Sequence, residues 1–280
     1  MRIGNPLVGL LCVFAISAGV QADEIVLEAS KDNTLYGESG LLSNGIGDYF
    51  FAGTTGSGNA RRAVLAFDLS DIPVGATIDS VSLQLNMSRT MAGAQPVALH
   101  RLNADWGEAK SHAFGEEGGG TLALAGDATW SFRFFDTDGW SAMGGDFAAA
   151  ASATTMVGSE GFYTWSSGGM VADVQSWIDE AGGNFGWILI GNEDAAPTAK
   201  RFDSLQNLVA ERRPKLTVEF NAGSDCQGDL DDSGDVGFTD LLAVLAAWGP
   251  CDGCVEDIDM SGDVGFTDLL VILAAWGPCP

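Results

Sequence analysis

The sequence predicts a mainly β protein, a two-sheet sandwich of the jelly-roll type with one short helix, followed by a small α-helical C-terminal module. Three observations favour this fold class. Short apolar segments alternate with clusters of Gly, Asn and Asp, the chain contains 38 Gly and is only 18% charged, and a segment near the C-terminus is repeated. The length of 280 residues leaves room for one substantial domain and one small one.

Residues 1–22 have the pattern of a secretory signal peptide. Arg2 supplies the positive start, residues 7–20 are apolar, and Val20 and Ala22 are small residues placed as a cleavage site requires. We expect cleavage after Ala22 and a secreted or cell-surface protein with no membrane span in the mature chain. An uncleaved membrane anchor is the alternative.

Residues 23–221 are expected to form the sandwich. The clearest strand signal is the alternation of apolar Val81, Leu83 and Leu85 with polar residues that face away. The same reasoning predicts strands over residues 24–28, 48–52, 63–68, 77–87, 97–102, 154–157, 162–165, 185–190 and 214–220. One helix is predicted over 170–178, where Val171, Val174 and Trp177 have helical spacing.

Several segments of this body occur in a familiar order. The segments are KDNTLYGES, RRAVLAFDLSDIPVGATIDSVSLQL, MVADVQSWID, FGWILIG and RPKLTVEF. Residues 25–220 resemble DNRLRE-type domains, which are β-sandwich modules of secreted bacterial and archaeal proteins grouped with carbohydrate-binding modules. The resemblance implies a polysaccharide ligand. Some relatives bind the polyanion alginate, which the net charge of −14 in residues 23–221 disfavours unless a local basic groove overrides it.

Sugar-binding surfaces combine flat aromatic rings with polar side chains. Tryptophans beside polar or small residues in expected loops are the candidate stacking platforms, with packing in the core as the alternative. They are Trp106, Trp130, Trp140 and Trp165, and the candidate polar or anion contacts are Arg61, Arg101, Lys200 and Arg201. Asp203 could pair with one of these cations, or could hold a structural calcium ion together with Asp32.

The sequence assigns no catalytic residue. It contains no G-x-S-x-G, no H-E-x-x-H and no phosphate loop, and it has only two His. Asp105 and Glu108 could serve as a carboxylate pair in a glycosidase. The alternatives to a non-catalytic glycan-binding protein are therefore a lyase or glycosidase and a structural cell-surface protein.

The repeat reads DLDDSGDVGFTDLLAVLAAWGPC and, 28 residues later, DIDMSGDVGFTDLLVILAAWGPC. Oxygen-bearing residues recur at loop positions 1, 3, 5, 7 and 12, with Gly at position 6 for the sharp turn, as calcium loops require. The side chains at positions 1, 3, 5 and 12 and the backbone carbonyl at position 7 are the expected ligands of two Ca²⁺ ions. These residues are Asp229, Asp231, Ser233, Asp235 and Asp240 in the first loop, and Asp257, Asp259, Ser261, Asp263 and Asp268 in the second.

Each loop closes with Asp rather than Glu and precedes a single helix. In this respect residues 225–280 resemble the duplicated calcium repeat of type I dockerins, which dock secreted polysaccharide-degrading proteins onto cohesin domains. The resemblance implies a cohesin-like or other surface protein as partner. Two departures weaken that implication: Phe238-Thr239 and Phe266-Thr267 stand where dockerins commonly have Ser-Thr, and basic residues are missing from the helices.

The module, residues 222–280, has 12 Asp or Glu and no Lys or Arg. Its carboxylates would repel one another without a cation, so we expect folding to depend on calcium, and we expect nucleic acid to be excluded as a partner. Both helices are apolar on every side, so a partner surface, the main domain or the repeat's own core must cover them.

Four cysteines flank the repeats: Cys226, Cys251, Cys254 and Cys279. An even number in a small exported module indicates disulfides, and three pairings are open. We favour Cys226–Cys251 and Cys254–Cys279, because each bond would close its own repeat.

Overall fold

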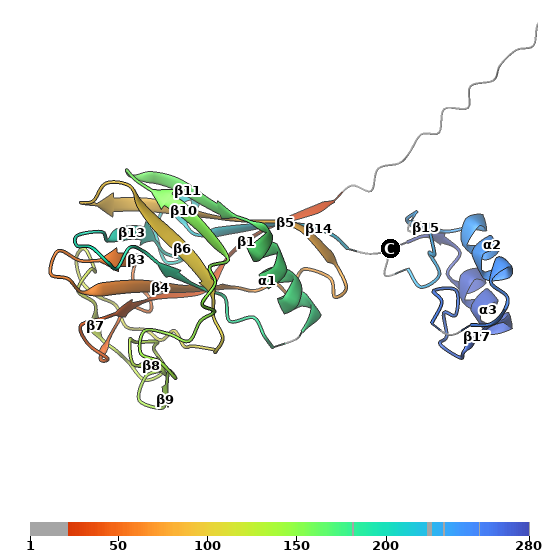
Figure 1. Ribbon diagram of the computed structural model, residues 1–280, viewed down its shortest axis with the longest axis horizontal. Helices are drawn as coiled ribbons and strands as arrows, with labels where there is room; N and C mark the ends of the chain where they lie inside the picture. Colours follow the sequence, from red (N-terminus) through yellow and green to blue (C-terminus); the bar gives the residue numbers. More distant parts are fainter. Residues whose placement is uncertain (1–21, 181, 223–225, 232, 252, 280) are drawn as a thin grey trace, which may run out of the picture.

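The structure, a computed structural model, describes residues 22–280 except 181, 223–225, 232, 252 and 280. All of the expected signal peptide except Ala22 lies outside these residues. The described chain is mainly β, as predicted, with one closed, sandwich-like sheet and three short α-helices (Figure 1). The finer jelly-roll topology stays a prediction.

Ten strands of the described chain form one continuous antiparallel sheet that folds into two layers. The first layer contains β5 (Thr77–Thr90), β11 (Gly161–Ser166), β13 (Lys200–Asp203) and β14 (Lys215–Asn221). The second contains β4 (Ala60–Phe67), β6 (Gln95–Arg101), β10 (Ala153–Val157) and β12 (Trp187–Ile190). The strands β1 (Asp23–Tyr36) and β3 (Tyr49–Thr54) pass from one layer to the other and close the sheet.

The passage of β1 between layers occurs at a bulge. Its first part pairs with β14 as far as Glu28, and its second part pairs with β4 from Ala29, with a register shift between Ala29 and Lys31. A bulge bends a strand and increases its twist, which lets one strand serve both layers.

The main core lies between the layers. The alternation predicted for β5 is confirmed, since Val81, Leu83, Leu85 and Met87 are fully buried there. The helix α1 (Gly168–Asp179) begins after Ser167, whose side chain accepts a hydrogen bond from the N–H of Met170. It adds its apolar stripe to the same core.

A second apolar cluster covers the outer face of the second layer. Leu35, Val64 and Ile188 point outward from their strands and pack against Trp106 and Trp140. The covering segment lies between β6 and β10 and contains β7 (Thr121–Leu122), β8 (Phe132–Phe134) and β9 (Asp138–Gly139). Of these, β7 pairs with β2 (Leu42–Ser43). The strands β4 and β12 are therefore buried on both faces.

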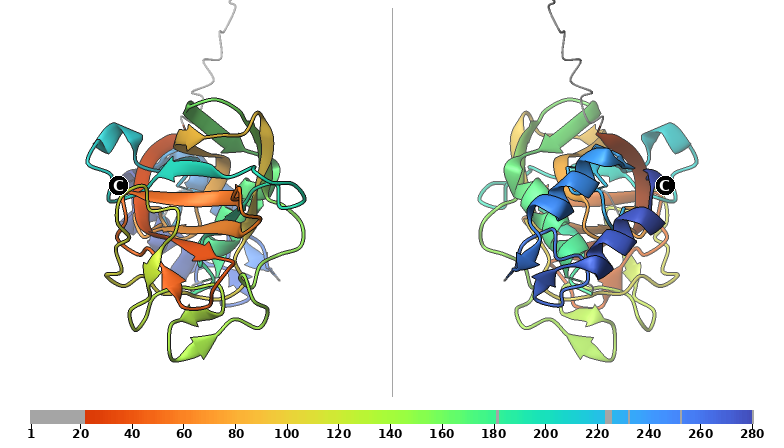
Figure 2. Two further views of the ribbon diagram at one scale, coloured as in Figure 1. Left: turned by 90° about the vertical axis from the view of Figure 1, so that its left-hand side faces the viewer. Right: turned by 90° about the vertical axis from the view of Figure 1, so that its right-hand side faces the viewer.

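After β13, a 3₁₀ turn, η1 (Ala210–Arg212), leads into β14 and ends the sandwich. The C-terminal module then contains α2 (Phe238–Ala246) and α3 (Phe266–Ala274), which lie side by side (Figure 2). Each repeat also pairs with the chain end of the other. β15 (Asp235–Val236) pairs with β18 (Gly277–Pro278), and β16 (Gly249–Pro250) pairs with β17 (Asp263–Val264).

The two repeats share one small core. Val236 and Val264 from the loops pack with Val244 and Ile272 from the helices, and all four are buried. Because the loop of each repeat pairs with the chain end of the other, the two repeats pack as a single unit.

Candidate metal centres and a cleft on the sandwich

Three aspartates converge in each of the two C-terminal loops. In the first loop, carboxylate oxygens of Asp229, Asp231 and Asp240 all lie within 4.8 Å of one another. Asp257, Asp259 and Asp268 do the same in the second loop, so six of the ten predicted ligand residues are gathered into two triads.

The closing aspartate of the first loop is held by the backbone around it. Asp240 lies in the first turn of α2 and is 1% exposed. Its Oδ1 accepts the N–H of Leu230 at 2.6 Å, and its Oδ2 accepts the N–H of Gly237 at 2.7 Å. Burial alone would raise the pKa of this carboxyl, but the backbone donors outweigh burial, so the pKa lies below its ordinary value. Asp240 is thus an anion fixed in place.

The second loop repeats this arrangement. Asp268 Oδ1 accepts the N–H of Ile258 at 2.8 Å, and its Oδ2 accepts the N–H of Gly265 at 2.8 Å. Burial again acts to raise the pKa and the backbone donors lower it below the ordinary value. The two loops are therefore equivalent in structure as well as in sequence.

Positions 5 and 7 also face each other. Ser233 Oγ lies 3.2 Å from the carbonyl oxygen of Asp235, and Ser261 Oγ lies 3.1 Å from that of Asp263. The turn between them requires Gly, because Gly234 has φ +86°. Each loop therefore brings a hydroxyl and a carbonyl together, at the two positions expected to supply ligands.

The donor set fits a hard cation. Each loop offers only oxygen atoms, from carboxylates, a hydroxyl and a backbone carbonyl, which are the ligands that Ca²⁺ prefers. Three carboxylates at this spacing repel one another, and residues 222–280 contain no Lys or Arg to offset the repulsion. A divalent ion at each triad would remove it.

The favoured disulfide pairing is wrong. The bonds join Cys226 to Cys279 and Cys251 to Cys254. The physical reason is the exchange of chain ends described above: the residue that follows each helix returns to the loop of the other repeat. Each disulfide therefore joins a cysteine that precedes one repeat to a cysteine that follows the other repeat.

The predicted aromatic platform is mostly absent from the sandwich surface. Trp106, Trp140 and Trp165 are buried, and each indole N–H donates to a backbone carbonyl, of Phe185 at 2.9 Å, of Thr129 at 2.9 Å and of Val97 at 2.8 Å. A buried ring cannot stack on a sugar, so the packing alternative holds for these three. Trp130 is half-buried, with the guanidinium of Arg62 over its ring at 4.8 Å.

Three of the four predicted cations are committed to the fold. Arg61 is 3% exposed and pairs with Glu38, and Arg101 donates to Ser176 Oγ at 2.7 Å. Lys200 is fully buried and its Nζ donates to three backbone carbonyls, those of Ala92, Gly93 and Gly158.

Two of these cations, Arg61 and Arg201, line a cleft of about 290 Å³ on the sandwich. The cleft also contains Phe51, Arg89 and Glu116, which the sequence reasoning did not single out. Arg89 lies directly opposite Arg201 in the ladder between β5 and β13, and both pair with Glu116. Sequence reasoning did not predict the strand β13, because its sequence KRFD is mostly charged, and so it did not place Arg201 opposite Arg89.

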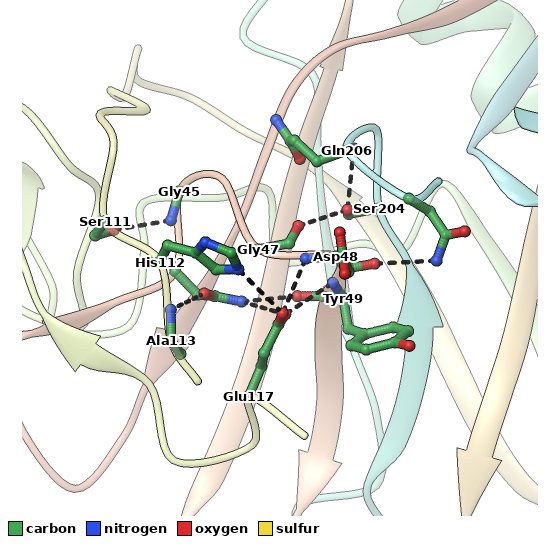
Figure 3. Close-up of polar contacts among 12 residues, drawn as sticks. Gly45, Gly47, Asp48, Tyr49, Ser111, His112, Ala113, Glu117, Ser204 and Gln206 are labelled. Atoms are coloured by element: carbon green, nitrogen blue, oxygen red, sulfur yellow. Dashed lines mark hydrogen bonds and ion pairs between the residues drawn. The ribbon is translucent and has the colours of Figure 1, made fainter. Parts of the chain in front are cut away.

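A polar cluster beside the cleft fixes the loop that carries Glu116. The carboxylate of the next residue, Glu117, accepts the N–H of Tyr49 at 2.9 Å and of Asp48 at 3.1 Å, and Nδ2 of Asn44 at 2.9 Å. Its Oε1 lies 3.6 Å from His112 Nε2 (Figure 3). These bonds position the wall of the cleft.

Asp105 and Glu108, the candidate carboxylate pair, have different partners in the structure. Asp105 pairs with Lys31 at 2.8 Å, whereas Glu108 accepts the N–H of Asp32 at 2.9 Å. Burial raises the pKa of Glu108 to about 7 and that of Asp32 to about 8. Among the described residues, Asp203 does not pair with a cation: its Oδ2 accepts Nδ2 of Asn86 at 2.7 Å, and its buried Oδ1 has no hydrogen-bond partner there. The alternative, a calcium ion held together with Asp32, stays a prediction.

No protein-family model and no curated protein matches this sequence. Within the residues that the structure describes, no helix is long and apolar enough to cross a membrane.

Proposed function

We propose that this is an exported protein whose C-terminal module binds two Ca²⁺ ions and docks the protein onto a partner. The observation that carries the proposal is the pair of aspartate triads, each with its carboxylate oxygens within 4.8 Å. The ion would be held by the triad, by the Ser hydroxyl and by the carbonyl at position 7. Bound there, it neutralises the triad and fixes the start of the helix that follows.

The docking surface of this proposal is the exposed apolar stripe that each helix forms together with the Trp two residues after its end. One stripe consists of Phe238, Leu242, Leu245 and Trp248, and its repeat consists of Phe266, Leu270, Leu273 and Trp276; these side chains are 47–66% exposed. The alternative in which the repeat's own core covers both helices completely is therefore wrong. Apolar surface of this kind marks an interaction site, which supports a cohesin-like or other surface protein as partner.

Calcium titration of the purified full-length protein by calorimetry tests the proposal. We expect two binding events in the wild type and one in the Asp240→Asn variant, because that substitution replaces a charged, buried carboxylate of the first triad by a neutral amide with a single oxygen. Glu256→Gln removes the same charge from the module outside either triad and should leave both events. Absence of heat for calcium in the wild type would contradict the proposal.

A second candidate function, glycan binding by the sandwich, is favoured by the cleft. The guanidinium groups of Arg89 and Arg201 line it as hydrogen-bond donors, and the volume of about 290 Å³ is near the lower end for small-molecule sites. Retention on polysaccharide affinity gels, lost in Arg201→Ala, would support it. Release of reducing sugars or unsaturated products would instead favour the glycosidase or lyase alternative, and binding to no polysaccharide would favour a structural surface protein.

A further inference from the structure

The cysteines contact the calcium loops at the same two loop positions in both repeats. In the first loop, the carbonyl of Cys226 accepts the N–H of Asp229, at position 1, at 2.9 Å. The N–H of Cys279 donates to the carbonyl of Gly234, at position 6, at 3.0 Å. Cys279 Sγ also lies 3.6 Å from Asp229 Oδ2, the side chain expected to bind the ion.

The second loop is held in the same way. The carbonyl of Cys254 accepts the N–H of Asp257, at position 1, at 3.3 Å, and the N–H of Cys251 donates to the carbonyl of Gly262, at position 6, at 3.0 Å. In both loops, therefore, one cysteine holds the first ligand residue and another holds the glycine of the turn.

The two cysteines that hold a loop are the two that are bonded to each other. Cys226–Cys279 spans the first loop, and Cys251–Cys254 spans the second. We propose that each disulfide positions one calcium loop, so that each bond sets the calcium affinity of its own loop and little of the other's. This inference rests on the proposed calcium binding.

The physical argument is preorganisation. The ion needs positions 1, 3, 5, 7 and 12 to converge, and the turn at position 6 aims position 7 inward. A disulfide that fixes positions 1 and 6 relative to each other removes freedom that the ion would otherwise have to restrict on binding. The cysteines bind no calcium themselves in this account; they are positioning residues.

The two disulfides should differ in how much each contributes to the calcium affinity of its loop. Cys226–Cys279 joins residues 53 apart, at the two ends of the module, and places a sulfur beside a ligand carboxylate. Cys251–Cys254 joins residues only 3 apart. Since a bond that closes a longer segment restricts the open chain more, the first loop should depend more on its disulfide than the second.

Linkage requires the converse effect. If a disulfide strengthens calcium binding by some factor, calcium must make that disulfide harder to reduce by the same factor. A dithiol reductant supplies the two electrons and two protons that convert the disulfide into two thiols, and it closes into its own cyclic disulfide. Calcium should shift this equilibrium toward the oxidised protein.

The test uses full-length protein with one loop disabled at a time. In the Asp257→Asn protein only the first loop should still bind calcium, and in the Asp229→Asn protein only the second loop should. In the first background, replacing Cys226 and Cys279 together by Ser should weaken calcium binding about tenfold or more, whereas replacing Cys251 and Cys254 should change it less than about threefold. In the second background the larger effect should come from Cys251 and Cys254.

The thiol–disulfide equilibrium provides a second readout that does not need a variant lacking its disulfide to fold. Calcium should protect Cys226–Cys279 from a dithiol in the Asp257→Asn protein and should not protect it when Asp229 is also replaced by Asn. Equal affinities with and without each disulfide, or equal losses at both loops, would overturn the inference while leaving calcium binding intact. Absence of calcium heat in the wild type would instead contradict the proposed function itself.

Discussion

At the scale of single residues, the sandwich contains two carboxyl groups in an environment that disfavours their charge. Asp32 is 1% exposed. The Glu108 carboxyl accepts the backbone N–H of Asp32, so a second acidic group lies close to the Asp32 side chain. Burial raises the pKa of Asp32 to about 8, and that of Glu108 to about 7. Both groups hold protons in the folded chain that the unfolded chain releases above about pH 4.

The stability of the sandwich should therefore fall as the pH rises. The folded state binds more protons than the unfolded state between about pH 4 and pH 8, so the free energy of unfolding decreases across this range and levels off above it. In the presence of a chelator, we expect the melting temperature of the sandwich to be at least about 2–4 °C lower at pH 8.5 than at pH 5, which corresponds to about 1 kcal/mol.

Asp32→Asn is the matched variant for this measurement. Asn keeps an oxygen that can accept the N–H of Leu205, as Asp32 Oδ2 does at 2.7 Å, but it does not ionise. Most of the pH dependence should disappear in this variant. A sandwich whose melting temperature rises between pH 5 and pH 8.5 would show that the two carboxylates are stabilised in their charged form.

At the scale of secondary structure, periodicity predicted the elements that bury one face or lie within apolar runs. The helix predicted over 170–178 is α1, and each of the nine predicted strands overlaps an observed one. Sequence reasoning failed where tertiary contacts decide. It ended the first strand at Glu28, although β1 continues to Tyr36 by changing partner, and it missed β13 because Lys200 and Arg201 are unusual in a buried strand.

The same distinction explains the candidate sites. The two aspartate triads could be predicted because their residues are local in sequence, within twelve positions of each other. The cleft could not, because Arg89, Glu116 and Arg201 come from distant segments that only the folded sheet brings together. The tryptophans were assigned to loops from their polar neighbours, but the segment that carries Trp106 and Trp140 folds over the second layer as an additional core.

The stripes on α2 and α3 give a prediction at this scale. Trp248 and Trp276 are each 51% exposed, so the calcium-loaded protein should bind a neutral apolar dye such as Nile red. Replacing both by Ser should reduce dye fluorescence by roughly half or more, without changing calcium affinity, because neither residue belongs to a triad. Val255→Ser, an exposed apolar residue outside the stripes, is the control. Unchanged fluorescence in the double variant would mean that the stripes are not the accessible apolar surface.

At the scale of the whole molecule, the described chain has separate cores with different requirements. The two sandwich clusters are built from residues before 223, and the third is built entirely from the repeats. The sandwich core has Trp, Phe and Leu side chains in two layers. The repeat core is small and depends on two disulfides and, in our proposal, on two ions that offset its 12 acidic residues.

Heating the full-length protein should therefore produce two transitions. Calcium at about a hundred times its dissociation constant stabilises a folded site by about 2.7 kcal/mol, which for a module of this size raises the melting temperature by about 10 °C or more. Only the transition of the repeats should move with calcium, and only that of the sandwich should carry the pH dependence of Asp32. Scanning calorimetry of the wild type and of the Asp240→Asn/Asp268→Asn double variant distinguishes the two unfolding transitions. In the double variant, the shift of the melting temperature with calcium should vanish. A single transition that calcium moves as a whole would mean that sandwich and repeats unfold as one cooperative unit.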